Sequence, residues 1–205
     1  MFAILTSAFI TMLVVVDPIG LGPIFIGLTQ GIDAPTRRKI GLQASIIAFG
    51  VLAGSALIGD WLLRGLGISL AAFRIAGGLL LFAIAFEMVF GRRIERKVTL
   101  TGGANDALSI AAFPLGIPLM AGPGAITAMV LLAGQMNGNM LGVALLIGIM
   151  GIMMASSFAV FLAAERLERL LGVQGEMVLG RLLGVLLAAL AVQYVADGIL
   201  ALSHH

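Results

Sequence analysis

The chain has 205 residues, of which 60% are hydrophobic and only 11% are charged, and its formal net charge is +2. Soluble domains carry about 25% charged residues, so this chain has too few to cover a globule in water, and its mean hydropathy of +1.15 indicates an integral membrane protein. The absence of cysteine excludes thiol chemistry, iron–sulfur centres and thiolate zinc sites.

Six apolar segments follow one another along the chain, each at or above the roughly 20 residues that cross a bilayer. They cover residues 2–30, 40–63, 70–91, 106–134, 140–164 and 179–202. We therefore predict an all-α integral membrane protein with six transmembrane helices in one membrane domain, residues 1–205.

Basic residues are concentrated in alternate connections between these segments. The first, third and fifth connections carry most of them: Arg37, Arg38, Lys39, Arg92, Arg93, Arg96, Lys97, Arg166 and Arg169. By the positive-inside rule these connections are cytoplasmic and both termini lie outside. The basic residues are thus read as topology signals, and no nucleic acid partner is predicted.

The first segment contains "DPIGLGPIF", residues 17–25, near its middle. Proline removes a helical hydrogen bond and clashes with the preceding turn, so we expect this helix to be broken at Pro18. The fourth segment carries a similar stretch, "PLMAGP", with a second expected break at Pro118. Irregular backbone at membrane depth is tolerated where it is buried in protein or lines a cavity, so both breaks point to one central cavity.

Further matches between the two halves indicate an internal repeat. "PIGLGP" from Pro18 matches "PLMAGP" from Pro118, "DWLLRGLG" from Asp60 matches "ERLERLLG" from Glu165, and "RIAGGLLL" from Arg74 matches "RLLGVLLA" from Arg181. We predict two three-helix repeats, residues 1–97 and 104–205, joined by a charged and glycine-rich linker over 91–106. Because three spans are odd in number, the second repeat has inverted topology.

The two breaks together suggest a pocket for a zwitterion. We expect Pro23 and Pro123 to start new half-helices, whose free N–H groups near residues 22–24 and 122–125 suit a carboxylate. Asp17 and carbonyls freed by the break suit an ammonium group. The candidate substrate-binding residues are Asp17, Gly20, Gly22, Pro23, Gly122, Pro123, Gly124 and Thr127. Two alternatives stay open: Asp17 caps the half-helix or pairs with an arginine, and Thr127 bonds its own backbone.

Catalytic and metal chemistry find little support in the sequence. The only histidines are His204 and His205, which we interpret as a tag remnant, so no metal site is predicted. Asp17 has no obvious catalytic companion, and no phosphate-binding loop motif is present. We expect neither an enzyme nor a cofactor.

Three segments resemble the MarC/SnatA family of bacterial and archaeal inner-membrane proteins. They are "VVVDPIGLGPIFIGLT", "FPLGIPLMAGPGAITAMVLLAG" and "RLLGVLLAALAVQYVADGI". The resemblance implies a plasma-membrane location and transport of small neutral amino acids, glycine and alanine in particular. Carried over by position, the family's broken segments fall on Asp17, Pro18, Gly20, Gly22, Pro23, Pro118, Gly122, Pro123 and Gly124.

The predicted function is secondary transport of small neutral amino acids by alternating access around the two breaks. A coupling proton on Asp17 is a further hypothesis, since a buried carboxylate can change its pKa. The alternatives are a channel or exporter for another small solute, and a non-transporting membrane scaffold or regulator. Gly50, Gly54, Gly180 and Gly184 have small-xxx-small spacing, which predicts close packing inside the protomer and only weakly suggests a homo-oligomer.

Overall fold

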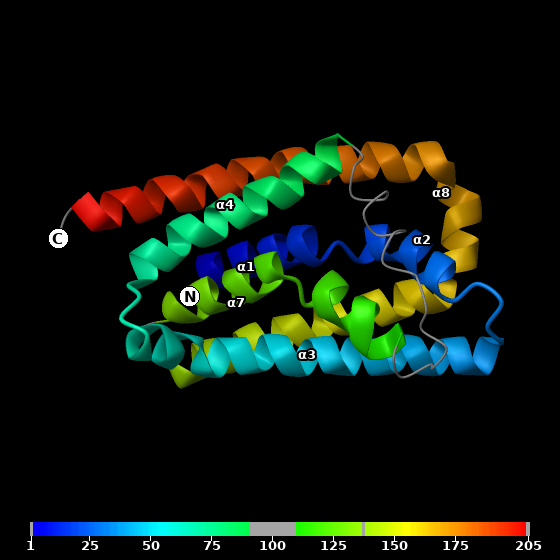
Figure 1. The fold of residues 1–205 in the computed structure, drawn as a ribbon, viewed down its shortest axis with the longest axis horizontal. Coiled ribbons are helices and arrows are strands. Elements are labelled where there is room, and N and C mark those ends of the chain that lie inside the picture. The colour runs from blue at the N-terminus through cyan, green and yellow to red at the C-terminus, as the bar shows by residue number, and fades with distance from the viewer. Residues whose placement is uncertain (1, 91–109, 137, 204–205) are drawn as a thin grey trace.

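The computed structural model describes residues 2–90, 110–136 and 138–203, and all the regular elements in these ranges are helices (Figure 1). They are α1 (Phe2–Val16), α2 (Pro18–Leu28), α3 (Ala34–Gly65), α4 (Leu70–Val89), the π-helix η2 (Ala111–Met120), α7 (Pro123–Gly134) and α8 (Met140–Ser203). The predicted linker over 91–106 lies outside the described residues, as do His204 and His205.

Within the described ranges, five segments are long and apolar enough to cross a membrane. They are Ile4–Leu28, Ala34–Gly65, Leu70–Val89, Met140–Ala164 and Met177–Ser203. A bent pair, η2 and α7, makes a sixth if it counts as one span, and its two parts meet at 56°. The all-helical membrane class is therefore confirmed, whereas the inverted repeat stays a prediction.

The expected fifth connection is not a loop. The backbone of α8 is helical from Met140 to Ser203, and it turns at one end of the molecule between its two membrane-length parts (Figure 1). The start of α1 and the end of α8 lie toward the opposite end, beside the α3–α4 connection. This placement puts Phe2 and Ser203 toward one end of the bundle, although which side of a membrane this end faces stays a prediction.

Short polar caps define where the helices begin. The Thr36 N–H donates to Asp33 Oδ2 at 3.1 Å before α3, and the Ala72 N–H donates to Ser69 Oγ at 3.1 Å before α4. The Thr36 backbone N–H holds the pKa of Asp33 below its usual value because it stabilises the carboxylate. Each cap satisfies an N–H group that has no partner within the helix.

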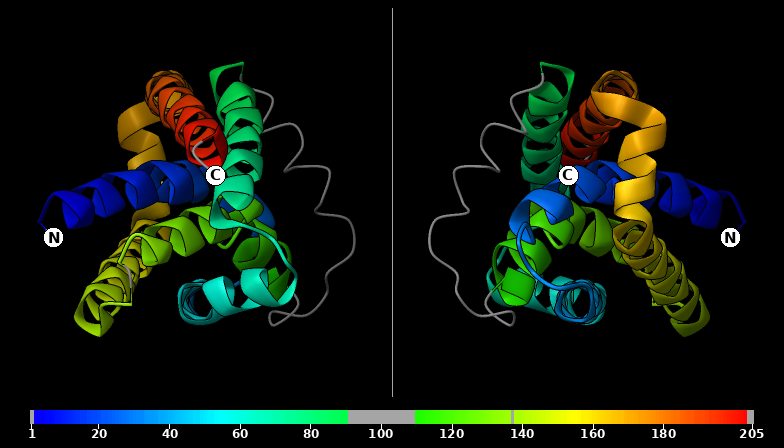
Figure 2. Two further views of the ribbon diagram at one scale, coloured as in Figure 1. Left: turned by 90° about the vertical axis from the view of Figure 1, so that its left-hand side faces the viewer. Right: turned by 90° about the vertical axis from the view of Figure 1, so that its right-hand side faces the viewer.

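The interrupted helices lie at the centre of the bundle. The apolar stretch of Ile4–Leu28 is 56% buried, against 22% to 33% for the other four spans. Viewed along the long axis, α2 and α7 lie between α3 and the pair formed by α4 and the last part of α8 (Figure 2). This arrangement places Asp17, between α1 and α2, inside protein, whereas Phe113 and Ile117 of η2 are exposed.

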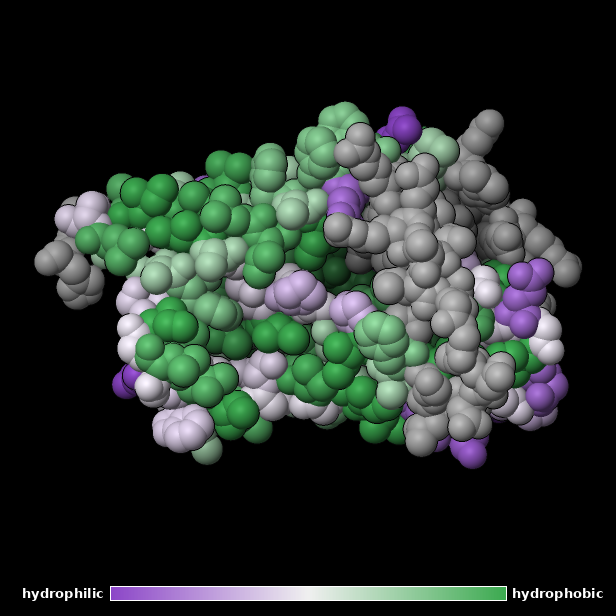
Figure 3. All heavy atoms as spheres, viewed as in Figure 1, coloured by the Kyte–Doolittle hydropathy of each residue, from purple (hydrophilic) through white to green (hydrophobic). Residues whose placement is uncertain are grey.

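The outer surface is apolar, as a lipid-facing surface must be. Trp61 is 74% exposed, and Ile46, Leu57 and Leu186 are also exposed. On the face drawn in Figure 3, hydrophobic side chains cover most of the described surface, and hydrophilic ones lie mainly toward the end where α3 begins. A bilayer is the environment in which this surface is stable.

Glycines bring α4 close to the last part of α8. A Cβ at Gly78 would lie 2.7 Å from the Ala191 carbonyl oxygen, and one at Gly198 would lie 2.6 Å from Ile75 Cγ1. Gly184 likewise packs on Met88, whereas Cβ positions at Gly50, Gly54 and Gly180 have no neighbour within 4 Å in the described part of the chain. Of the four small-xxx-small glycines, Gly184 alone fits the expected internal packing there.

Candidate functional site at the two helix interruptions

The first interruption is a single residue, Asp17, between α1 and α2. Its backbone is left-handed, with φ 50° and ψ 66°. The Asp17 N–H still donates to the Leu13 carbonyl at 3.0 Å, and the Leu21 N–H donates to the Asp17 carbonyl at 3.1 Å. The hydrogen-bond ladder therefore passes through the interruption.

Two carbonyls near Asp17 nevertheless lack a helical donor. A helical residue donates to the carbonyl four positions before it, and proline has no N–H. Pro18 and Pro23 therefore cannot serve the carbonyls of Val14 and Ile19. Val14 lies three residues before Asp17 and Ile19 lies two residues after it, so both oxygens are within about one helical turn of Asp17.

The Asp17 carboxylate caps α2, which was one of the alternatives left open by the sequence. The Gly20 N–H donates to Asp17 Oδ1 at 3.1 Å, and the Asp17 side chain is only 6% exposed. A Cβ at Gly20 would overlap this carboxylate. Glycine is therefore required at position 20 by the space that the cap occupies.

The predicted start of the first half-helix was wrong. We expected α2 to begin at Pro23, with free N–H groups near residues 22–24, but it begins at Pro18 and contains Pro23 in its interior. The physical reason is Asp17, because a capping side chain directly before Pro18 favours that proline as the first helical residue. The N-terminus of α2 is consequently occupied by the protein's own carboxylate.

The second interruption is longer and differs in geometry. Phe113 and Ile117 have extended backbone within η2, and the Ile117–Pro118 peptide bond is cis. Pro118 thus lies in irregular backbone before the turn at Ala121 and Gly122.

The α7 helix begins with Gly122 as its N-cap and Pro123 in its first turn. The first N–H to bond within the helix is that of Ile126, which donates to the Gly122 carbonyl at 3.0 Å. The N–H groups of Gly124 and Ala125 precede it and have no intrahelical acceptor. Gly122 makes no side-chain cap here, so this N-terminus can receive an anion from elsewhere.

The start of α7 packs against the last turn of α1. A Cβ at Gly124 would lie 3.7 Å from Val15 Cγ1, near the end of α1, and 2.8 Å from Ile84 Cδ1 on α4. Thr127 is buried, and its Cγ2 fills the space above Gly77. The start of α7 therefore lies between the end of α1 and α4.

Other predicted site residues point elsewhere. A Cβ at Gly22 would lie 3.4 Å from Val160 Cγ1 on α8, and Pro123 is exposed. The structure thus brings Gly124 to Val15, two residues before Asp17, while Gly22 faces α8. The inward-facing site residues Gly124 and Thr127 are in close contact with neighbouring helices.

A polar cluster near α1 was missed by the sequence reasoning. Thr11 and Tyr194 are buried and lie close together, and the charged groups of Arg74 and Asp197 are near Tyr194. Arg74 Nε is buried without a hydrogen-bond partner in the described part of the chain. One signal could have found the cluster: Tyr194 is the only tyrosine in the chain, inside an apolar span.

A groove of about 530 Å³ runs beside this cluster, between α1 and the last part of α8. Its lining is mainly apolar, with Ser7, Thr11 and Gln193 as the polar residues, and it includes Val14, about one turn before Asp17. A smaller cavity lies where α3 begins. Neither of these two hollows is lined by a predicted site residue.

The sequence matches the model of the "MarC family integral membrane protein" over residues 2–203. The chain belongs to the MarC family. The family resemblance inferred from the interrupted segments is therefore confirmed, and the match covers almost the whole chain.

Relatives in the MarC family occur in bacteria and archaea. A membrane protein from Aquifex aeolicus is 37% identical, covering 97% of this chain and 94% of the relative. One from Archaeoglobus fulgidus is 36% identical, covering 94% and 91%, and the Escherichia coli protein YhcE is 33% identical, covering 97% and 93%. All three are named UPF0056 membrane proteins, and no solved structure matches.

Proposed function

We propose that this MarC family protein is a secondary transporter of small neutral amino acids such as glycine and alanine. The observation that supports the proposal is the packing of the start of α7 against the last turn of α1, because it brings two unlike interruptions near each other. One has a buried carboxylate and the other has an open helix N-terminus. A zwitterion needs one group of each kind.

The two interruptions divide the recognition of the solute between them. The solute carboxylate binds the N–H groups of Gly124 and Ala125, where the helix dipole adds positive potential. The ammonium group binds the Asp17 carboxylate and the carbonyl of Val14, which has no helical donor. This assignment replaces the symmetric one expected from the sequence, because Asp17 already occupies the N-terminus of α2.

Small size is the expected basis of selectivity. Gly20 and Gly124 have no side chains, and the space beside them is taken by the Asp17 carboxylate and by Leu81 and Ile84. Solute binding requires these α4 side chains to move, so the described conformation corresponds to a closed state of the proposed cycle. Opening occurs by movement of residues 1–97 against 104–205, with the groove that includes Val14 as one route to Asp17.

Counterflow in proteoliposomes tests the proposal. Vesicles are loaded with unlabelled glycine, and trace labelled glycine is added outside. We expect transient accumulation with the wild type and its loss in Gly122→Leu, because bulk there meets the Pro118 carbonyl, 2.6 Å from the Cβ position. Gly27→Leu is the matched control, since a Cβ at Gly27 has no neighbour within 4 Å.

A charge variant separates the ammonium contact from the helix cap. Asparagine caps helices as well as aspartate does, so Asp17→Asn preserves α2 and removes the negative charge. We expect it to lose glycine counterflow, whereas Asp60→Asn, at an exposed i,i+4 ion pair with Arg64, keeps it. Failure of folded wild type to accumulate glycine, alanine or serine would refute the amino-acid proposal, and solute flux without counterflow would instead indicate a channel.

A further inference from the structure

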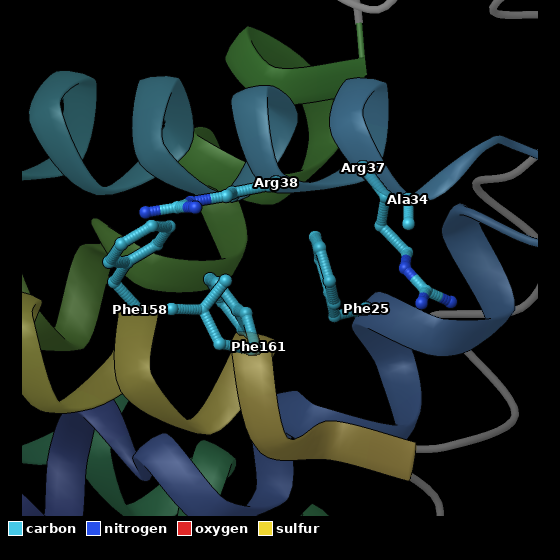
Figure 4. Close-up of a pocket in the computed structure, with 8 residues that line it drawn as sticks. Phe25, Ala34, Arg37, Arg38, Phe158 and Phe161 are labelled. Carbon is cyan, nitrogen blue, oxygen red and sulfur yellow. The ribbon is translucent and has the colours of Figure 1, made fainter.

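A cavity of about 200 Å³ lies where α3 begins and the first membrane-length part of α8 ends (Figure 4). Its lining residues are Phe25, Ala34, Arg37, Arg38, Gly41, Phe158, Phe161 and Leu162. Arg37 and Arg38 lie at the start of α3, and Leu162 lies in the last turn of the span Met140–Ala164. The cavity is therefore at the depth where the hydrocarbon core meets the headgroups.

Aromatic rings form a rigid wall in this cavity. Phe25 and Phe161 are stacked, with ring centroids 4.4 Å apart and an interplanar angle of 19°. A Cβ at Gly41 would lie 3.2 Å from Phe161 Cδ2, so glycine allows α3 to approach the rings. In Figure 4, Arg38 lies along Phe158, while Arg37 extends on the other side of Phe25.

The described lining of the cavity carries basic groups. Two arginines and no acidic residue are among the lining residues whose side chains the structure describes. Asp33, next to Ala34, caps α3 through the Thr36 N–H. A guanidinium group matches the geometry of phosphate oxygens, so the lining favours a phosphate group.

The open side of the cavity is apolar. Leu162 is 54% exposed, and at this depth the apolar rim meets lipid chains. Arg38 is at the end of the molecule that the positive-inside rule assigns to the cytoplasm, where anionic lipids attract basic residues. A water-soluble phosphate compound would leave the apolar rim without a partner.

We infer that this cavity binds the phosphate headgroup of an anionic phospholipid, with the acyl chains along Phe158 and Leu162. The site is separate from the proposed solute site and does not depend on transport. Its recognition element is the Arg38 guanidinium group, which lies along Phe158 at the hydrophobic rim.

Native mass spectrometry of the detergent-purified protein tests this inference. The protein is equilibrated with equal amounts of phosphatidylglycerol and phosphatidylcholine, and bound lipid is counted. We expect preferential retention of phosphatidylglycerol. Arg38→Gln should weaken this binding about fivefold, because one basic residue near an anionic membrane surface contributes about that factor to binding. Lys39→Gln removes the same charge from the next residue, which does not line the cavity, and should bind as the wild type does.

A second variant and a soluble competitor complete the test. Phe158→Ala changes no charge and should also weaken retention, while size-exclusion chromatography verifies that each variant is folded. Equal loss in Lys39→Gln and Arg38→Gln, or equal retention of phosphatidylcholine, would overturn the inference. Displacement of the lipid by millimolar inorganic phosphate would do the same, because it would assign the site to a soluble phosphate.

Discussion

Asp17 serves the first interruption through two properties, its tolerance of left-handed backbone and its acceptor oxygen. Asparagine keeps both properties, glycine keeps the tolerance of left-handed backbone, and alanine keeps neither. We expect Asp17→Asn to unfold within about 0.5 kcal/mol of the wild type and Asp17→Gly to lose a few tenths more. Asp17→Ala should lose about 2–3 kcal/mol, because it gives up the cap and adds a left-handed penalty.

Reversible unfolding of the four proteins in mixed detergent micelles measures this order. Asp60→Ala, at an exposed ion pair, is the control for loss of a carboxylate. If Asp17→Ala and Asp17→Asn were equally stable, the cap and the left-handed backbone would contribute nothing.

Gly77 and Thr127 form a steric pair between α4 and α7. The Thr127 Cγ2 occupies the place of a Cβ at Gly77, so Gly77→Ala should destabilise the fold by about 1–3 kcal/mol. Thr127→Ser removes that methyl group and should restore most of the loss in the double variant. Thermal unfolding of the single and double variants gives the coupling, and Gly50→Ala, in open space, is the control. Strictly additive effects would show that the two residues do not meet.

At the scale of elements, the contact between α4 and the last part of α8 depends on backbone proximity. Gly184 and Gly180 lie one turn apart on α8, but a Cβ at Gly184 would be 2.9 Å from Met88 Cβ, whereas one at Gly180 meets nothing within 4 Å. We expect Gly184→Ala to lower the thermal unfolding temperature in detergent and Gly180→Ala to leave it unchanged or slightly raised. The opposite order would contradict the packing of α4 on α8.

The same motif produces different elements in the two halves, and this limits what sequence reasoning can decide. Hydropathy located the membrane-length segments because bilayer thickness determines their length. The helix start was ambiguous because Pro18 and Pro23 both suit a first turn. Asp17 precedes Pro18 with a side-chain acceptor, whereas Ile117 precedes Pro118 without one, so the second helix begins only at Pro123.

At the scale of the whole molecule, orientation is testable because the chain has no native cysteine. Single cysteines at Gln30, Leu66 and Ser203 sample both ends of the bundle, and all three positions are exposed. The positive-inside rule predicts that a membrane-impermeant maleimide labels Leu66→Cys and Ser203→Cys in intact cells, and Gln30→Cys only after permeabilisation. Labelling of Gln30→Cys alone in intact cells would show that the orientation is the opposite of the predicted one.

Contacts between distant segments lie beyond single-sequence reasoning. Thr11, Arg74 and Tyr194 come from α1, α4 and α8, and each alone reads as an isolated polar residue in an apolar run. The proximity of Gly124 to Val15 is of the same kind. Such meetings depend on how the helices cross, which hydropathy and spacing do not encode.

The unlike hydrogen bonding of the two interruptions has a consequence for amide exchange with heavy water. The amides of Asp17 and Leu21 are bonded across the first interruption and should exchange as slowly as any amide in a continuous helix. Those of Gly124 and Ala125 have no intrahelical acceptor, so their exchange depends on whether water reaches them. Fast deuteration confined to the start of α7 would mean that solvent penetrates to the middle of the protein at this point, and bound glycine should slow it.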